Sequence, residues 1–148
     1  MRDLAQDPNV MSVIRLALSE DIGSGDATTA ALVDPAAIGE GVILSRVPCR
    51  VAGACVAKAV FREVDPSIVV TDVIPDGQPV AAGGDILTIR GKAASILTAE
   101  RTALNFMQRM CGIATLTARF VEAVKPWGTM ILDTRKTTPC LRAFEKYA

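Results

Sequence analysis

The chain has 148 residues, of which 50% are hydrophobic and only 4% aromatic, and its 16 basic and 16 acidic side chains give a formal net charge of zero. This length allows one ordinary domain, or one domain and part of a second, and an aliphatic core favours α/β packing over an aromatic-rich β-sandwich. No apolar run approaches the roughly 20 residues that a membrane span needs, and the N-terminus lacks the apolar segment of a signal peptide, so we expect a cytoplasmic protein.

The first predicted element is an amphipathic helix over residues 9–20. Val10, Ile14 and Leu18 recur there at helical spacing, after a proline of the kind that the first helical turn tolerates. Two glycines among acidic and hydroxyl side chains then indicate a loop at residues 20–26. Its spacing differs from that of a P-loop and its acidic residues repel phosphate. We therefore interpret it as a structural turn rather than a phosphate-binding loop.

The next part of the chain predicts a compact α+β segment followed by a long helical region. Short runs of apolar and β-branched residues between turn signals predict strands, and longer runs with one apolar face predict helices. The strands are expected at residues 41–46, 50–52, 67–73 and 86–90, and the helices at residues 28–32, 53–64 and 93–125. Cys111 and Gly112 interrupt the last of these, and we expect a kink or a change of helix there.

Residues 129–139 carry the strongest local indication of function. The apolar and β-branched run at residues 129–133 predicts a buried strand, which Pro139 prevents from continuing. Arg135 and Lys136 follow this strand directly. Because ligands bind at the carboxyl ends of strands in parallel α/β architectures, two adjacent cations here indicate an anion-binding site. The alternative is a solvated pair at an ordinary strand exit.

A final helix is expected from residue 141 to residue 148, directly after that strand and its loop. A strand followed by a helix is the first β/α unit of a parallel sheet or barrel. One such unit cannot bury its own apolar surface. We therefore expect the chain to be the front part of a longer protein.

Residue types and charge distribution limit the chemistry further. The chain contains no histidine, which removes the usual general base at neutral pH. The cysteines form no Cys-x-x-Cys pair, so we expect no zinc site and reduced, structural thiols. Residues 1–100 hold 8 basic and 13 acidic side chains, and residues 101–148 hold 8 and 3. The cations of the second part are spread out, which favours a small polyanionic ligand over nucleic acid.

Four motifs together resemble one enzyme family. They lie at residues 18–29, 100–109, 112–115 and 132–139, and the resemblance covers essentially the whole chain. The family is the quinolinate phosphoribosyltransferases, also called carboxylating nicotinate-nucleotide pyrophosphorylases. Any one of the motifs alone would be a weaker indication than the four in this order and spacing.

The resemblance implies a fold and a reaction. The fold class would be an α+β N-terminal sandwich of the hammerhead type over residues 1–110, followed over residues 111–148 by the first β/α unit of a truncated α/β barrel. The reaction would transfer a phosphoribosyl group from phosphoribosyl pyrophosphate to quinolinate with decarboxylation, giving nicotinate mononucleotide in de novo NAD biosynthesis. Magnesium would bind with phosphoribosyl pyrophosphate through ligands beyond residue 148. Further family site residues also lie beyond that point, so we expect the chain alone to be inactive.

The resemblance also assigns substrate-binding residues, although no catalytic residue and no metal ligand within the chain. Thr134, Arg135 and Lys136 match substrate-binding positions at the end of the first barrel strand. Arg101 matches a residue that reaches the active site of the partner subunit in a homodimer; without the resemblance it would be interpreted as a solvated helix arginine. Carboxylate and phosphate substrates require such cations. Cys140 departs from the family pattern, which usually has glycine there.

Two alternatives remain open from the sequence. A molybdenum-transport-associated paralogue shares this fold and much of the pattern, and would predict binding without proven synthesis. The loop at residues 20–26 and the intact Thr-Arg-Lys triplet favour the biosynthetic enzyme. The other alternative is a non-catalytic dimerisation module, which the length of the chain favours and its motifs do not.

Overall fold

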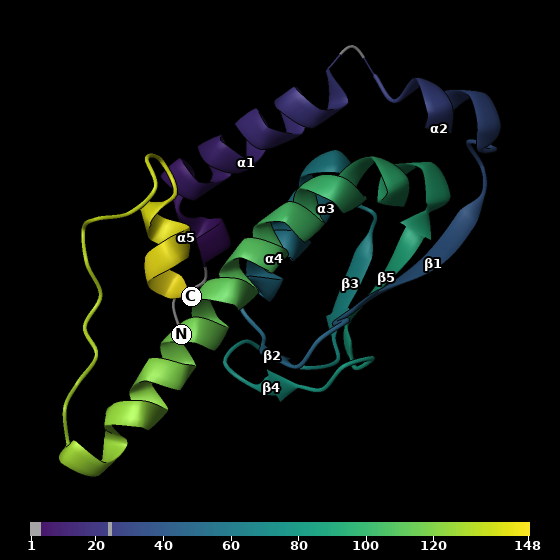
Figure 1. Cartoon of the computed structure of the whole chain (residues 1–148). Helices are drawn as coiled ribbons and strands as arrows, with labels where there is room; N and C mark the ends of the chain where they lie inside the picture. Colours follow the sequence, from purple (N-terminus) through teal and green to yellow (C-terminus); the bar gives the residue numbers. More distant parts are fainter. Residues whose placement is uncertain (1–3, 24) are drawn as a thin grey trace.

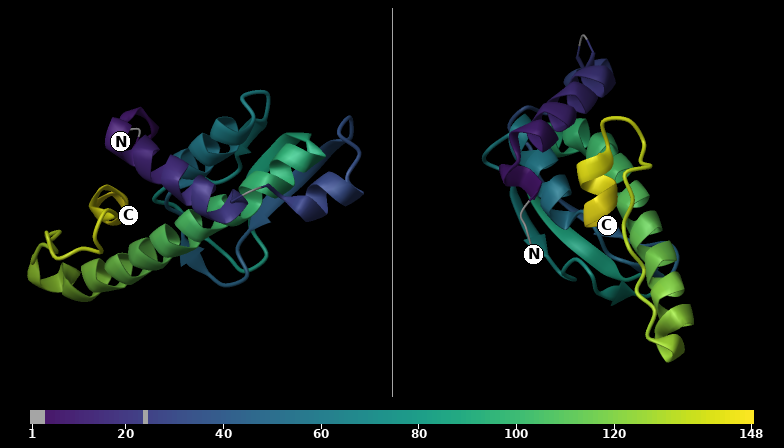
Figure 2. Two further views of the ribbon diagram at one scale, coloured as in Figure 1. Left: turned by 90° about the horizontal axis from the view of Figure 1, so that it is seen from above. Right: turned by 90° about the vertical axis from the view of Figure 1, so that its left-hand side faces the viewer.

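Helix α4 (Ala93–Val124) runs through the whole fold, with small antiparallel sheets on one side and helix α1 on another (Figures 1 and 2). The computed structural model describes residues 4–23 and 25–148. The other elements, in chain order, are η1 (Leu4–Gln6), α1 (Pro8–Ile22), α2 (Ala27–Leu32), β1 (Ile38–Leu44), β2 (Cys49–Arg50), α3 (Ala54–Val64), β3 (Val69–Asp72), β4 (Pro79–Val80), β5 (Asp85–Lys92), η2 (Lys125–Trp127) and α5 (Arg142–Tyr147).

A three-stranded antiparallel sheet in the order β1-β5-β3 supports helix α4, and β2 and β4 form a separate antiparallel pair. Successive side chains of β1 point to opposite faces of this sheet. Gly39 lies against the start of α4, where an added Cβ would stand 3.3 Å from the Cβ of Ala93. On the same face Ile43 is buried, whereas Val42 on the opposite face is exposed. One face of the sheet therefore packs on the helix.

Helices α3 and α4 pack closely because one residue between them has no side chain. Gly53 precedes α3 with φ of +92°, a conformation that other residues rarely adopt. An added Cβ there would stand 2.7 Å from the Sδ atom of Met110, which is buried. The two helices enclose the centre of the core with Val56, Val60, Phe61, Ala103, Met107 and Met110.

Most of the helices and strands expected from the sequence are present. Helices α1, α2, α3 and α5 and strands β1, β2, β3 and β5 lie where they were predicted, within a few residues. The short strand β4 was not predicted. Ser24, in the predicted loop at residues 20–26, lies outside the described residues. The predicted α+β class is confirmed as a mixed α/β fold with small antiparallel sheets.

The predicted change of helix at Cys111 and Gly112 is wrong, because α4 continues without interruption through both residues. Glycine in a helix interior costs about 1 kcal/mol relative to alanine. Packing on both sides of this glycine outweighs that cost, since Met107 and Met110 before it and Ala114 after it are buried. Tertiary contacts therefore overrule the local preference.

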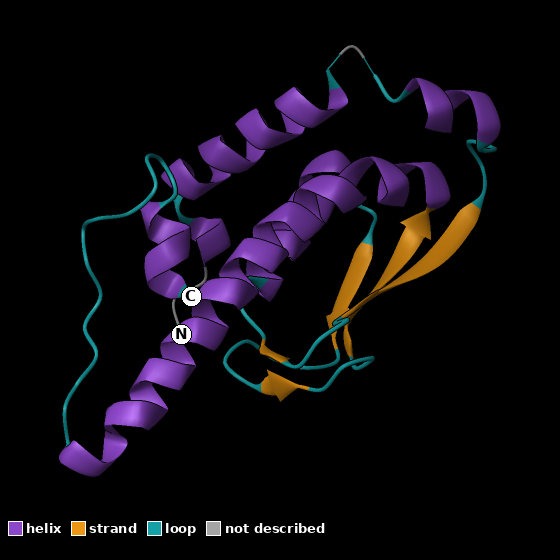
Figure 3. Cartoon of the chain, in the orientation of Figure 1, coloured by secondary structure: helices purple, strands orange, loops and turns teal. Residues whose placement is uncertain are grey.

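The predicted buried strand at residues 129–133 is also wrong. This segment has no regular secondary structure, and it connects α4 to α5 as an extended chain (Figure 3). Met130 and Leu132 are exposed over 78% and 77% of their surface. A strand forms only where a neighbouring strand takes up its backbone hydrogen bonds. Among the described residues no strand pairs with this segment.

The hydrogen-bonded carboxylate of Asp65 leads us to expect that the folded chain is less stable in acid. Asp65 follows α3, and its carboxylate accepts hydrogen bonds from the Ser67 hydroxyl (2.7 Å), the Ser67 N–H (2.9 Å) and the Ser95 hydroxyl of α4 (2.9 Å). Hydrogen bonds from Ser67 and then from Ser95 lower the pKa of Asp65 from 3.8 to about 2. Because the folded-state pKa is the lower one, the stabilisation is complete above about pH 4 and is lost as the pH falls towards 2.

Urea denaturation between pH 6 and pH 2 measures this contribution. Asp65→Asn should lose the part of the acid destabilisation that falls between about pH 4 and pH 2. Ser95→Ala should lose a smaller part, because the two hydrogen bonds from Ser67 remain. An Asp65→Asn profile parallel to that of the wild type over this range would contradict the prediction.

Candidate functional site

The extended segment between α4 and α5 encloses a hollow of about 810 Å³ against both helices. Thr134 and Lys136 line it from the segment, and Gln108 and Ile113 line it from α4. Their positions result from the extended chain, which leaves the C-terminal end of α4 and returns along the helix to α5 (Figures 1 and 2). Two of the predicted substrate-binding residues therefore face one concave surface.

Residues 134–138 begin with a tight local turn. We call them the substrate loop, after the role that the sequence resemblance implies for residues 134–136. The Thr134 hydroxyl accepts a hydrogen bond from the backbone N–H of Lys136, at 3.1 Å. Thr134, Arg135 and Lys136 are all exposed. Arg135 makes no hydrogen bond or ion pair with any other described residue and does not line the hollow. Both cations are thus accessible to an anion from solution.

Helix α5 holds the end of the substrate loop, and α5 itself is held by an aromatic contact. The Phe144 ring stacks on the Phe106 ring of α4, with centroids 5.0 Å apart and planes inclined by 22°. Phe144 is only 1% exposed. Such an offset pair adds to the large apolar area that each ring buries. The stack fixes α5 on the middle of α4.

A half-buried carboxylate, that of Asp76, ties the last residues of α5 to the start of α3. Asp76 accepts hydrogen bonds from the backbone N–H groups of Gly53 and Ala54, both at 3.0 Å, and from the Tyr147 hydroxyl at 2.8 Å. A carboxylate is favourable at the positive end of a helix. Burial, and then the hydrogen bond to Asp76, raise the pKa of Tyr147 above its ordinary value. The neutral phenol therefore remains a hydrogen-bond donor.

Arg109 of α4 joins the substrate loop to α5. Its guanidinium donates to the hydroxyl of Thr138 and to Oε1 of Glu145. Oε2 of Glu145 accepts the backbone N–H of Thr138 at 3.2 Å. Arg109, and then Thr138, lower the pKa of Glu145. These three residues form a closed cluster at the end of the substrate loop.

Arg101 lies apart from the other predicted site residues. Its Nη1 donates to Oδ1 of Asp21 of α1 at 2.9 Å, and its side chain is 74% exposed. The hydrogen bond to Asp21, and then the charge of Asp21, raise the pKa of Arg101 above its ordinary value. Arg101 lies eight residues before Arg109, or about 12 Å along the helix, and it does not line the hollow of the substrate loop. Within this chain the structure does not bring Arg101 together with residues 134–136.

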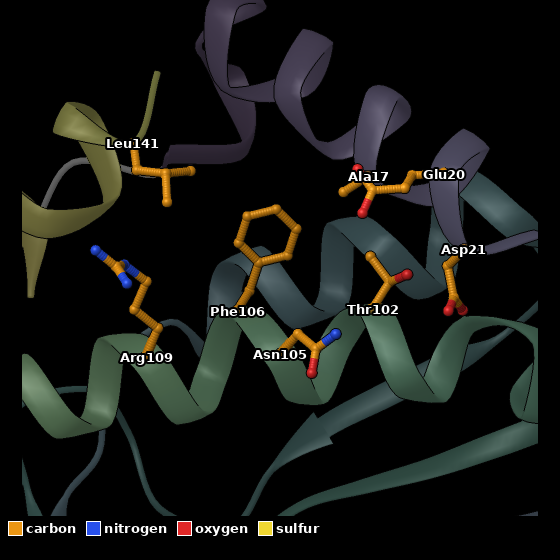
Figure 4. A pocket seen from close by; sticks show the side chains of 8 residues that line it. All are labelled: Ala17, Glu20, Asp21, Thr102, Asn105, Phe106, Arg109 and Leu141. Atoms are coloured by element: carbon orange, nitrogen blue, oxygen red, sulfur yellow. The ribbon is translucent and has the colours of Figure 1, made fainter. Parts of the chain in front are cut away.

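A second hollow, of about 380 Å³, lies between α1 and α4 (Figure 4). Asp21 borders one end of it and Arg109 and Leu141 border the other, with the Phe106 ring between them. Arg109 thus lies between the two hollows and lines both. The sequence motif at residues 100–109 contains Arg109 but gave no reason to assign it a role, because its partner is 36 residues away.

Neither a metal site nor a membrane span is found in the part of the chain that the structure describes. No group of three or more carboxylate, histidine or cysteine side chains there could hold a metal ion. Among the same residues, no helix is long and apolar enough to cross a membrane.

Two family models together match the chain from residue 26 to residue 148. The N-terminal domain of quinolinate phosphoribosyl transferase matches residues 26–111, and the C-terminal domain matches residues 113–148. The chain belongs to the quinolinate phosphoribosyltransferase family. The resemblance inferred from the four sequence motifs is confirmed. The two matches meet at residue 112, inside the uninterrupted helix α4.

Curated quinolinate phosphoribosyltransferases are similar over almost the whole chain. Quinolinate phosphoribosyltransferase [decarboxylating] 1 of Nicotiana glauca is 45% identical over 95% of this chain and 40% of its own length. The probable nicotinate-nucleotide pyrophosphorylase [carboxylating] of Synechocystis is 40% identical over 88% of this chain and 44% of its own length. The chain therefore spans about two fifths of the curated relatives that it matches.

Solved structures of quinolinate phosphoribosyltransferase relatives share the fold. NadC from Streptococcus pyogenes has a TM-score of 0.88 and 38% identity, over 92% of this chain and 48% of its own. The nicotinate-nucleotide pyrophosphorylase from Francisella tularensis has a TM-score of 0.89 and 36% identity, over 99% of this chain and 52% of its own. The mixed α/β arrangement described above is therefore that of the family.

Cys140 adopts a backbone conformation that favours glycine. Among the described residues it is the one non-glycine residue with positive φ, at 65°, and its side chain is exposed. A side chain in this left-handed region costs roughly 1–2 kcal/mol. Glycine avoids this strain, but it loses more conformational entropy on folding, which offsets part of the stabilisation. Cys140→Gly should therefore raise the free energy of unfolding by about 0.5–1 kcal/mol, measured by urea denaturation. Cys140→Ala should show no such gain, and equal values for both variants would contradict the prediction.

Proposed function

We propose that this chain serves the transfer of a phosphoribosyl group from phosphoribosyl pyrophosphate to quinolinate. Decarboxylation follows, and the product is nicotinate mononucleotide for de novo NAD biosynthesis. The observation that carries the proposal is the family match over both parts of the chain. The names of the relatives, quinolinate phosphoribosyltransferase and nicotinate-nucleotide pyrophosphorylase, support the same reaction.

The exposed cations of the substrate loop are suited to these substrates. Quinolinate carries two adjacent carboxylates, and phosphoribosyl pyrophosphate carries a phosphate and a diphosphate. Arg135 offers a planar fork for bidentate contact with a carboxylate or phosphate, and Lys136 offers a compact point charge. Thr134 adds a hydroxyl on the wall of the hollow. These residues bind and orient substrate and stabilise negative charge as diphosphate leaves the ribosyl carbon.

Arg101 serves a second active site in this proposal, that of the partner subunit in a homodimer. Two observations support this assignment. Asp21 holds one edge of the guanidinium while the side chain stays 74% exposed, so other donors face outward. Arg101 is also absent from the hollow of its own substrate loop. An outward, pre-oriented arginine fits an anionic ligand bound on another chain.

The remaining assignments belong to the same proposal. Residues 1–110 form the hammerhead-type sandwich domain and residues 111–148 begin the barrel domain. Magnesium is bound by the diphosphate and by ligands outside residues 1–148. The cytoplasm is the proposed location. The free thiols of Cys49, Cys111 and Cys140 fit its reducing conditions, whereas several plant relatives are named mitochondrial or chloroplastic.

The test is an activity assay on a protein in which this chain is extended to the full length of its relatives. We call it the long protein. It is mixed with quinolinate, phosphoribosyl pyrophosphate and Mg²⁺, and nicotinate mononucleotide and carbon dioxide are measured. Equimolar formation of both products is the expected result. The 148-residue chain assayed in parallel should show no turnover. Quinolinate binding without product formation by the long protein would overturn the proposal and favour the molybdenum-transport-associated paralogue.

A further inference from the structure

The substrate loop has no regular secondary structure, so its position depends on side-chain contacts at its two ends. Near its start, Asp133 pairs with Lys146 of α5 at 2.9 Å. The Asp133 side chain is 58% exposed and the Lys146 side chain 38%, and an ion pair that water reaches in this way contributes little. At its end, the loop meets the cluster of Arg109, Thr138 and Glu145. Arg142 of α5 also donates to the Thr137 hydroxyl, at 3.3 Å and on an exposed surface. Of these contacts, the cluster is the one best able to fix the loop.

The cluster at the end of the loop is more sheltered than an ordinary surface ion pair. The shelter is on the carboxylate side: Arg109 is 44% exposed, but the Glu145 side chain is only 14% exposed, and each of its oxygens has a separate donor. Oε1 accepts from Arg109, and Oε2 accepts from the backbone N–H of Thr138. Hydrogen bonds to charged groups are roughly twice as strong as neutral ones. The loop backbone is thus bonded directly to a carboxylate that an arginine holds in place.

Both partners of the ion pair stand on rigid elements. Arg109 lies on α4 between the buried residues Met107 and Met110. Glu145 follows Phe144, whose ring is fixed by its stack on α4. The cluster therefore holds the end of the loop at a fixed place relative to α4 and α5. Lys136 lies two residues before Thr138, which places its Cα within about 7 Å of the anchored residue.

We propose that Arg109 and Glu145 are positioning residues, which set the place of Arg135 and Lys136 by holding the end of the substrate loop on helix α4. This inference rests on the proposed function of those two cations. Arg109 itself is held by Glu145 and Thr138, so it acts through the loop rather than on the substrate. Anionic substrate needs the loop cations at a fixed distance from the wall of the hollow, because charge-assisted hydrogen bonds depend steeply on geometry.

The first experiment measures loop order without any substrate. Backbone amide hydrogen exchange of the 148-residue chain is followed by mass spectrometry for peptides covering residues 134–141 and 54–64. Arg109→Met and Glu145→Gln should each speed exchange in residues 134–141 by about tenfold or more. Exchange in residues 54–64 should stay unchanged, which shows that the rest of the fold is intact.

Arg119→Met is the matched control. Arg119 lies on the same helix, is exposed, and forms no hydrogen bond or ion pair with another described residue. Its substitution should leave exchange in residues 134–141 at the wild-type rate. The double variant of Arg109 and Glu145 should exchange no faster than the faster single variant, because both changes remove one interaction. Wild-type exchange in Arg109→Met and Glu145→Gln would overturn the inference, whatever the activity.

The second experiment measures the consequence for substrate in the long protein that carries this chain. Arg109→Met and Glu145→Gln should raise KM for an anionic substrate by about tenfold, with a smaller change in kcat. Arg109→Lys keeps the positive charge but loses the planar pair of N–H donors, and its KM should lie between those of the wild type and Arg109→Met. Unchanged KM values would overturn the inference. A long protein without activity, with the exchange result intact, would instead reject the proposed function alone.

Discussion

Replacing Phe144 by alanine is expected to release helix α5 and to cost about 3–5 kcal/mol of stability. Phe144 is 1% exposed and stacks on Phe106, so the substitution leaves a cavity and removes an aromatic pair. Helix α5 has six residues and no side-chain cap at its start, and a helix of this length does not persist on its own. Detachment and unfolding of α5 are therefore one event.

Phe120→Ala is the control for this prediction, because it makes the same chemical change on an exposed part of α4. Phe120 is 56% exposed, and its substitution should change stability by no more than about 0.5 kcal/mol. Urea denaturation followed by circular dichroism compares the two variants, and hydrogen exchange shows where each one opens. Equal denaturation midpoints for Phe144→Ala and Phe120→Ala would rule out the anchoring role of the stack.

Removing the cations of the substrate loop should have the largest effect on activity. In the long protein, Arg135→Ala and Lys136→Ala should each lower kcat/KM by about 10- to 100-fold, since hydrogen bonds to charged groups contribute about 1.5–3 kcal/mol. Both side chains are exposed, so neither change should lower the free energy of unfolding. A loss of activity without a loss of stability separates a binding role from a structural one.

Two further variants sharpen this result. Lys136→Arg retains the charge and should keep more activity than Lys136→Ala, although the different shape of the group prevents full recovery. Arg119→Ala removes an exposed cation of α4 and should leave kcat/KM at the wild-type value. If Arg135→Ala and Lys136→Ala both retained wild-type kcat/KM for quinolinate and for phosphoribosyl pyrophosphate, the assigned binding role would be wrong.

The sequence predicted those elements whose signals are local. Val10, Ile14 and Leu18 lie one helical turn apart, and all three are buried in α1 as expected. The errors lie where distant contacts decide. Gly112 interrupts a helical pattern, yet α4 continues through it with buried residues on either side. Residues 129–133 have the composition of a strand, but no strand among the described residues pairs with them.

The candidate site was predictable only in part for the same reason. The adjacent cations Arg135 and Lys136 were visible as a local pattern, and the family resemblance gave them a substrate. Glu145 is 36 residues from Arg109, and no local pattern joins them. The ion pair of Arg101 with Asp21 links residues 80 apart, so its orientation was likewise visible only in the folded chain.

The unbroken helix α4 has a mechanical consequence. The matches to the N-terminal and C-terminal family domains meet at residue 112, where a flexible connection would act as a hinge. Hinge motions need a loop or the end of an element to absorb the change in backbone angles, and here a continuous helix of 32 residues takes that place. Helix α4 therefore connects the two regions rigidly. A change in the angle between the regions on either side of residue 112 would therefore require this helix to bend or break.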